Sequence, residues 1–175
     1  VKEIGSHCFS GFSGLENITL PSTLKEIGEY AFQGCSSLTN IRIPDGVTML
    51  DEGAFQGCLQ LETINIPAGV TEISSYQFAG SSIRSITIPE KVKRIGRNAF
   101  CGCTALKSVM ISEGVEEIGE SAFEQTGISS LTIPGSVKRI GRMAFMMCVS
   151  METLTLTNGV GKIENDAFFG CSALK

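Results

Sequence analysis

Side chains of the kinds that carry out acid–base or nucleophilic chemistry are sparse in this sequence. His7 is the only histidine among the 175 residues, and it lies in an irregular first stretch where we expect an exposed loop. Cysteine- and serine-based nucleophilic catalysis normally depends on an imidazole base beside the nucleophile. The sequence therefore predicts no catalytic residue and a protein that is not an enzyme.

One pair of cysteines has the spacing of half a metal site. Cys101 and Cys103 are separated by a single residue, but a structural zinc site needs four ligands, usually a second cysteine pair or two histidines. Neither completes the set here, and no glycine-rich phosphate-binding motif follows a predicted strand. We therefore expect no metal site and no cofactor.

Two adjacent carboxylates, Glu116 and Glu117, resemble a general acid–base pair. However, the equivalent positions one period earlier and one period later are the basic pairs Lys93-Arg94 and Lys138-Arg139. Stacking would place the acidic pair between the two basic pairs, and each exposed ion pair contributes only about 0.2–1 kcal/mol. We interpret these residues as surface charges that favour the correct register between stacked units.

These charges are placed by a repeat that runs through the whole chain. Eight of the ten phenylalanines recur at separations of 22 or 23 residues, and an isoleucine or leucine precedes each of them by five residues. A fixed period of about 20 to 29 residues with Leu-x-x-Leu-x-Leu-like spacing is typical of a leucine-rich-repeat solenoid. The anchoring residues are Phe9, Phe32, Phe55, Phe78, Phe100, Phe123, Phe145 and Phe168.

The second unit, residues 27–44, predicts the local structure. Ile41 and Ile43 alternate with polar residues, which is the period of a short strand with one buried face, and the proline that follows ends the strand. Upstream, an apolar segment bracketed by Gly28 and Gly34 is too short for a stable helix. We expect a turn or 3₁₀ piece there, with the glycines permitting sharp reversals.

The unit resembles the BspA-like, or Treponema-type, leucine-rich repeat. The pattern of that family runs Leu-x-x-Ile-x-Ile-Pro-x-x-Val-x-x-Ile-Gly-x-x-Ala-Phe-x-x-Cys, and Asp51 departs from it where glycine is usual. The resemblance covers the whole chain. In one unit it rests on Leu38, Ile41, Ile43, Pro44, Val47, Leu50, Ala54, Phe55, Gly57 and Cys58.

We therefore predict a right-handed α/β leucine-rich-repeat solenoid of about 7.5 units of 22–23 residues. A parallel β-sheet is expected on the concave face, with short turns, 3₁₀ segments and brief strands on the convex side. Residues 1–175 form a single array with no domain boundary. Neither end carries a polar cap, so we expect a segment of a longer protein.

A cysteine recurs three residues after the anchoring phenylalanine. Stacked units would hold these Cα atoms about 5 Å apart with parallel Cβ vectors, so we expect free core thiols and no disulfide. Ser81 and Thr126 take this slot in the two short units, where we expect the hydroxyl to bond backbone groups. Cys101 lies outside the slot and is predicted to be exposed. The slot is occupied by Cys35, Cys58, Cys103, Cys148 and Cys171.

The charge and hydropathy of the chain argue against binding of nucleic acid and against insertion into a membrane. The formal net charge of −4 and the isoelectric point near 5.1 argue against binding of nucleic acid. The apolar content of 42 % is supplied by the repeated framework positions. No run reaches the roughly 18–20 apolar residues of a membrane span, so we expect no membrane insertion of this segment.

The outward face of the predicted strands is the candidate binding surface. In leucine-rich repeats this face is the usual ligand surface, and here it is rich in hydroxyl and amide groups. It is either simply good strand composition, since threonine suits strands, or a shallow polar platform for a protein. Tyr30 and Tyr76 lie elsewhere and offer an alternative pair of anchors. The candidate residues on the strand face are Arg42, Asn65, Thr87, Met110, Thr132 and Thr155.

The leading hypothesis is a non-enzymatic protein-binding module. The resemblance implies a cell-surface or secreted protein of bacteria or protists that binds host or neighbour-cell proteins, such as a host extracellular-matrix protein. The residues alone equally suit a structural spacer or an intracellular scaffold, and they leave a cytoplasmic location open. A third alternative is an accessory repeat array of an enzyme that lies outside this segment.

Overall fold

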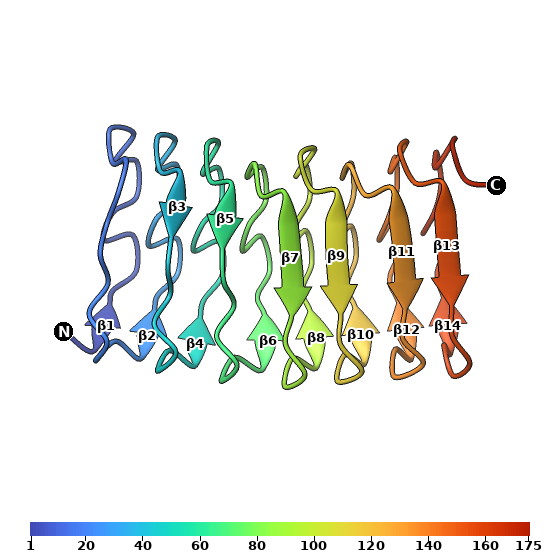
Figure 1. Ribbon diagram of the computed structural model, residues 1–175, viewed down its shortest axis with the longest axis horizontal. Coiled ribbons are helices and arrows are strands. Elements are labelled where there is room, and N and C mark those ends of the chain that lie inside the picture. The colour runs from blue at the N-terminus through green and yellow to red at the C-terminus, as the bar shows by residue number, and fades with distance from the viewer.

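The computed structural model describes residues 1–175 and contains strands and turns but no helix. The chain coils into a row of stacked units with strands on the front and on the rear, and the units of β1 and β14 have a rear strand only (Figure 1). The front strands are β3 (Asn40–Ile41), β5 (Thr63–Ile64), β7 (Ser85–Ile88), β9 (Ser108–Ile111), β11 (Ser130–Ile133) and β13 (Thr153–Leu156). The rear strands are β1 (Glu3–Ile4), β2 (Glu26–Ile27), β4 (Met49–Leu50), β6 (Glu72–Ile73), β8 (Arg94–Ile95), β10 (Glu117–Ile118), β12 (Arg139–Ile140) and β14 (Lys162–Ile163).

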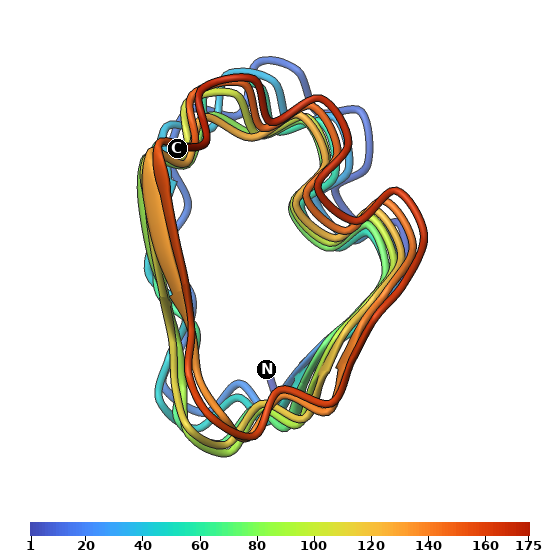
Figure 2. The same cartoon turned by 90° about the vertical axis from the view of Figure 1, so that its right-hand side faces the viewer.

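Every strand pairs in parallel with the equivalent strand of a neighbouring unit. On the rear, the order is β1-β2-β4 in one sheet and β14-β12-β10-β8-β6 in another; on the front, β3, β7 and β11 pair with β5, β9 and β13. Viewed along the row, the units superimpose as one closed outline with an inward bend in each turn of the coil (Figure 2). The predicted solenoid and its brief second strands are therefore confirmed.

A single column of phenylalanine rings runs through the core. Consecutive anchoring rings lie 5.1 to 5.9 Å apart between centroids and 2° to 20° from parallel. The rings from Phe32 to Phe145 are fully buried, and they belong to one cluster of 43 buried apolar residues. No unit could bury this surface alone, because each ring covers the ring of its neighbour.

The bend around each anchoring phenylalanine has an unusual backbone. The residues two before and two after it have positive φ in every unit. Glycine fills most of the second positions, such as Gly34 (φ 68°), but non-glycine residues fill nearly all of the first, including Tyr30 (φ 51°). Glycine is needed at position 28 for close packing and not for the sharp reversal that the sequence predicts. A Cβ there would lie 2.9 Å from the backbone nitrogen of Ser6 in the preceding unit.

Backbone hydrogen bonds explain why the bend is not a 3₁₀ helix. The N–H groups of Phe32 and Gly34 donate to the carbonyl groups of Ala54 and Gln56 in the next unit, each at 2.8 Å. Only the alternate N–H groups, such as that of Cys35, donate to the residue three positions back. Because every second donor is used between units, no continuous run of 3₁₀ bonds forms.

The front sheet is interrupted at the two short units. β5 and β7 are not hydrogen-bonded neighbours, and neither are β9 and β11. Ser81 and Thr126 lie in the bends just before β7 and β11, where one residue is missing from the period. The hydroxyl of Thr126 donates to the carbonyl of Phe123 at 2.9 Å, as predicted, whereas that of Ser81 lies 3.3 Å from the sulfur of Cys103.

The rear sheet is interrupted once, between β4 and β6, beside the first front interruption. At other junctions the backbone N–H in this position donates to the preceding unit, as from Gly96 to Ile73 at 2.7 Å. Here the N–H of Ser74 instead donates to the side chain of Gln77 at 2.9 Å, and the Ser74 hydroxyl donates to the carbonyl of Leu50 at 2.8 Å. Side chains thus replace a missing ladder bond, which accounts for the fully buried Gln77.

Removing one ring of the column should destabilise the whole array. Phe100→Ala would leave a cavity between two rings, so we expect the free energy of unfolding to fall by about 3–5 kcal/mol. Phe169→Ala is the matched control, since Phe169 is 61 % exposed, and its effect should stay below about 0.5 kcal/mol. Urea denaturation followed by circular dichroism measures both. Equal losses would show that the column is not what holds the units together.

Candidate functional site

The six candidate residues lie in one row across the front of the solenoid. Thr87 and Met110 are register partners on β7 and β9, and Thr132 and Thr155 are partners on β11 and β13. These four side chains are exposed. Arg42 and Asn65 continue the row just beyond the short strands β3 and β5. The structure therefore brings the predicted residues together as a surface, here called the strand face.

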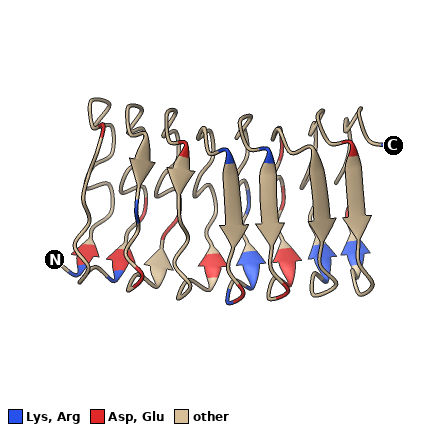
Figure 3. Cartoon of the chain, in the orientation of Figure 1, with Lys and Arg blue, Asp and Glu red and all other residues tan.

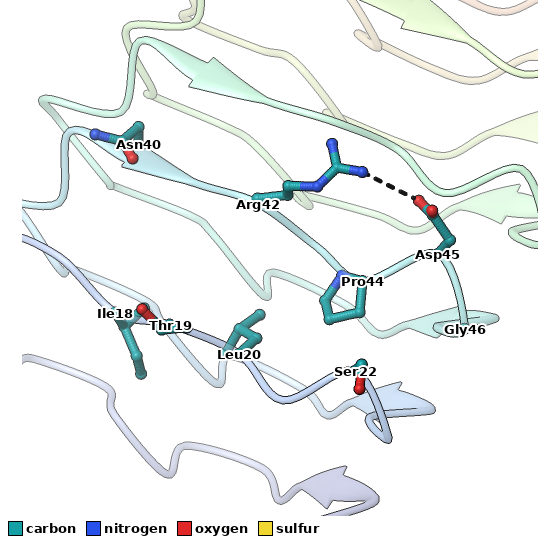
Figure 4. A pocket seen from close by; sticks show the side chains of 9 residues that line it. All are labelled: Ile18, Thr19, Leu20, Ser22, Asn40, Arg42, Pro44, Asp45 and Gly46. Carbon is teal, nitrogen blue, oxygen red and sulfur yellow. Dashed lines mark ion pairs between the residues drawn. The ribbon is translucent and has the colours of Figure 1, made fainter.

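Arg42 lies beside the first of three shallow depressions on the strand face. This depression has a volume of about 540 Å³ and is lined from Ile18 to Gly46 by two adjacent units. The Arg42 side chain extends toward Asp45, and the two charged groups are 3.6 Å apart (Figure 4). Both are largely exposed, at 78 % and 85 % of the side chain. The guanidinium is consequently held only weakly by its partner and stays accessible to a ligand.

Asn65 differs from the other members of the row because both polar atoms of its side-chain amide are hydrogen-bonded within the protein. Its side-chain oxygen accepts a hydrogen bond from the backbone N–H of Ile43 at 2.8 Å, and its side-chain nitrogen donates to the carbonyl of Ile43 at 2.9 Å. The amide thus extends the β3–β5 pairing beyond the two-residue strands. Its polar atoms are committed to the neighbouring unit, which makes Asn65 the least available residue of the strand face.

Met110 is the largest apolar side chain exposed at the centre of the strand face, at 64 %. It lines both remaining depressions, of about 420 and 470 Å³, which meet along Ser108 and Met110. The polar residues around them are mainly serine and threonine. A flexible thioether in a hydroxyl-rich surface can pack against partners of varied shape.

From β6 to β12 the rear strands of the solenoid carry alternating charges, acidic on β6 and β10 and basic on β8 and β12 (Figure 3). Arg94 lies 3.1 Å from Glu72 and 3.8 Å from Glu117, and Arg139 pairs with both Glu117 and Glu164 (Figure 3). A hydrogen bond from Arg139 lowers the pKa of the Glu164 carboxyl. The predicted placement of an acidic residue between basic ones is confirmed for this row.

In the neighbouring rear row of Lys93, Glu116 and Lys138, only one of the two predicted contacts of the acidic residue forms. Glu116 lies 3.1 Å from Lys93. Lys138 turns away from it and donates instead to the carbonyl groups of Gly135 and Gly159. Since all of these groups are exposed or half-exposed and most are paired, the rear face offers little unpaired charge for a ligand.

The alternative tyrosine anchors lie on the bend between rear and front strands. His7 is exposed as predicted, and its ring stacks on that of Tyr30 with centroids 5.2 Å apart. The Tyr30 hydroxyl donates to Glu52 at 2.6 Å, which with burial raises the pKa of Tyr30 to about 12. A Cβ on Gly53 would lie 2.2 Å from the Tyr30 ring, so this ring is packed across the next unit. Tyr30 and Tyr76 are half-buried and less available than the strand face.

All seven cysteines are free thiols. In the repeated slot each sulfur donates to the carbonyl of the anchoring phenylalanine one unit earlier, as from Cys58 to Phe32 at 3.1 Å. Burial raises the pKa of Cys58 to about 12 and that of Cys103 to about 11. The prediction that Cys101 is exposed is wrong: it is half-buried, and this burial raises the pKa of its thiol.

The sequence did not predict the hydrogen bonds of the Asn65 side-chain amide to the backbone of Ile43, nor the stacking of His7 on Tyr30. Neither leaves a periodic signal, because each depends on which side chain occupies the same slot in the next unit. No group of three or more histidine, cysteine, aspartate or glutamate side chains is arranged to hold a metal ion. No helix of the length and hydropathy needed to cross a bilayer is present.

The stacked parallel units and the strand face define a leucine-rich-repeat solenoid. The chain belongs to the BspA type leucine-rich repeat region family, which matches residues 1–96 and 71–175 with six copies of the repeat. No protein of curated function matches the chain.

Several solved structures are similar over the whole chain, among them the following three. A leucine-rich repeat protein from Bacteroides ovatus is 29 % identical, with a TM-score of 0.69, and the chain covers 58 % of its length. The Treponema pallidum leucine-rich repeat protein is 28 % identical, with a TM-score of 0.78 and 72 % of its length covered. A leucine-rich cell surface protein from Faecalibacterium prausnitzii is 28 % identical, with a TM-score of 0.57 and 69 % covered.

Thiol reactivity should follow burial rather than position in the sequence. In the native protein we expect exposed Cys8 to react with a chromogenic disulfide reagent first, and buried Cys58 and Cys103 to react very slowly. The reactive species is the thiolate, which burial disfavours. After denaturation all seven thiols should titrate; a smaller number would reveal a disulfide and contradict the packing described above.

The ionisation of Tyr30 should depend on Glu52. Because the raised pKa stabilises the neutral phenol in the folded state, its contribution to stability is complete below pH 10 and is lost as pH rises toward about 12. In a Tyr76→Phe background, ultraviolet titration should show a midpoint that falls toward 10 on Glu52→Gln. Glu29→Gln, which removes a weaker influence, should lower it less. An unchanged midpoint after Glu52→Gln would show that the hydrogen bond does not control this group.

Proposed function

We propose that this solenoid is a non-enzymatic module for protein recognition and that it binds through the strand face. The supporting observation is the row of exposed side chains that vary while the framework repeats. Arg42 and Met110 break an otherwise hydroxyl-rich row, and each lines a depression on the same face. Arginine and methionine are both enriched at protein interfaces, whereas serine is depleted there.

We also propose a surface or secreted location and a host or neighbour-cell partner. A similar protein of Faecalibacterium prausnitzii is described as a leucine-rich cell surface protein. The chain spans 58 % of the length of the Bacteroides ovatus relative. A host extracellular-matrix protein such as fibronectin is the partner to test first.

A spacer or scaffold is the second candidate, and one observation favours it. The strand face has no exposed tryptophan, tyrosine or phenylalanine, and protein hot spots usually include such anchors. A spacer would need only the rigid frame, and substitution of the strand face would then have no effect on any association.

Substitution of the two distinctive residues tests the strand face. Arg42→Ala and Met110→Ala should each weaken binding to immobilised fibronectin by about 1–2 kcal/mol, or roughly five- to thirtyfold in Kd, as measured by surface plasmon resonance. Both side chains are exposed, so the fold should be unaffected.

Matched controls lie on other faces of the same molecule. Met49→Ala removes an exposed methionine from rear strand β4, and Arg97→Ala removes an exposed arginine from the bend; neither should alter binding. Unchanged binding by the strand-face variants would move the site to another surface. A wild-type protein that did not bind fibronectin would contradict it as the matrix partner.

A further inference from the structure

The turn between β13 and β14 contains the one asparagine of the chain that is followed by glycine. Asn158 and Gly159 are both exposed. The other asparagines precede isoleucine, alanine or aspartate. Because glycine has no side chain to shield its backbone nitrogen, a neighbouring side-chain amide can approach that nitrogen closely.

Both groups that would react are free in the structure. The turn is closed only by a long hydrogen bond of 3.5 Å from the N–H of Val160 to the carbonyl of Thr157. The backbone N–H of Gly159 donates no backbone hydrogen bond, and the Asn158 side chain has no partner in the protein. The exposed position also gives water access to the reacting atoms.

Stacking of the repeats keeps glycine in this position. Gly159 has a φ of 115°, and a Cβ there would lie 2.5 Å from the backbone carbonyl oxygen of Gly135 in the preceding unit. A bulkier residue, which would protect its own amide, is therefore excluded by the packing. The fold thus requires the one neighbour that leaves Asn158 unprotected.

We propose that Asn158 is a site of spontaneous deamidation whose only reactants are the protein and water. The Gly159 nitrogen gives up its proton and attacks Cγ of Asn158; the new N–Cγ bond closes a five-membered succinimide ring. The Cγ–Nδ2 bond breaks, and ammonia leaves with that proton. Water then adds to either ring carbonyl and opens the ring to aspartate or isoaspartate, with no change in oxidation state.

A turn at the same position of the repeat already contains the aspartate product, although its glycine, Gly46, lacks the positive φ of Gly159. Residues 45–47, between β3 and β4, have the sequence Asp-Gly-Val, and deamidation to aspartate would give residues 158–160 the same sequence. The Nζ atom of Lys138 lies over the Asn158 turn, 2.8 Å from the carbonyl oxygen of Gly135 and 3.1 Å from that of Gly159. A new carboxylate would therefore form near a positive charge, which favours it.

The isoaspartate product would fit less well. It adds a methylene group to the backbone between β13 and β14. The register of Lys162 with Arg139 in the rear sheet depends on the length of this connection. The inference concerns the frame of the solenoid and does not rest on the proposed protein-binding role.

Isotope labelling of the intact protein tests the site. The folded protein is incubated in mildly alkaline buffer made with water enriched in heavy oxygen, and tryptic peptides are followed by mass spectrometry. The peptide of residues 143–162 should lose ammonia and gain one heavy oxygen roughly tenfold faster than the peptide of residues 3–25, which contains exposed Asn17 before isoleucine. Asn158→Gln should abolish the fast reaction.

Two results would overturn the proposal. Equal rates for the two peptides would show that Asn158 is not a preferred site. Conversion that occurs only after urea denaturation would show that the folded turn prevents the attack. The Asn158→Asp variant should have the same thermal midpoint as the wild type, since the turn at residues 45–47 already contains aspartate; a clearly lower midpoint would contradict the assignment of aspartate as the accepted product.

Discussion

Contact between equivalent phenylalanine rings is the interaction on which the rest of the structure depends. Each ring from Phe32 to Phe145 is buried by the rings of the units before and after it. The bend that carries the ring is held in the same way, because every second N–H group of the bend donates to the next unit. Burial and hydrogen bonding are therefore satisfied between units rather than within them. A unit that loses its neighbour loses both, so the array is stable only as a stack.

Because the contacts between units hold the array together, the residues that make them form a repeated frame, and the other residues form a variable surface. Residues that face inward must repeat, because each meets its own equivalent in the adjacent units. Residues that face outward are free to vary, and they do so differently on each face. The rear carries paired charges such as Arg139 with Glu164, the bend carries half-buried tyrosines, and the strand face carries small polar residues with Arg42 and Met110. The strand face combines depressions of about 420 to 540 Å³ with accessible, weakly held side chains.

The frame could be predicted from the sequence because its residues recur with a fixed period. The phenylalanine column, the cysteine slot and the alternating charges at Arg94, Glu117 and Arg139 all follow from that period. Three features could not be predicted, since each depends on local geometry rather than on composition. The positive φ two residues before each phenylalanine is shared by histidine, tyrosine, asparagine and methionine, which have no common propensity. The other two features depend on where individual strands end. They are the hydrogen bonds of the Asn65 side-chain amide and the side-chain hydrogen bonds of Ser74 and Gln77.

The junction where β4 and β6, and also β5 and β7, fail to pair has a mechanical consequence. Elsewhere along the row, at least one sheet carries backbone bonds from unit to unit. At this junction the two sheets are interrupted together, and the ring spacing of 5.9 Å between Phe55 and Phe78 is the widest in the column. The side chains of Ser74 and Gln77 replace the missing sheet bonds, beside backbone bonds of the bend such as that from Phe55 to Gln77. If the two ends of the array are pulled apart, tension acts on every junction in series, so the weakest one yields first. A stretched solenoid would therefore part into two blocks of repeats here, each still folded.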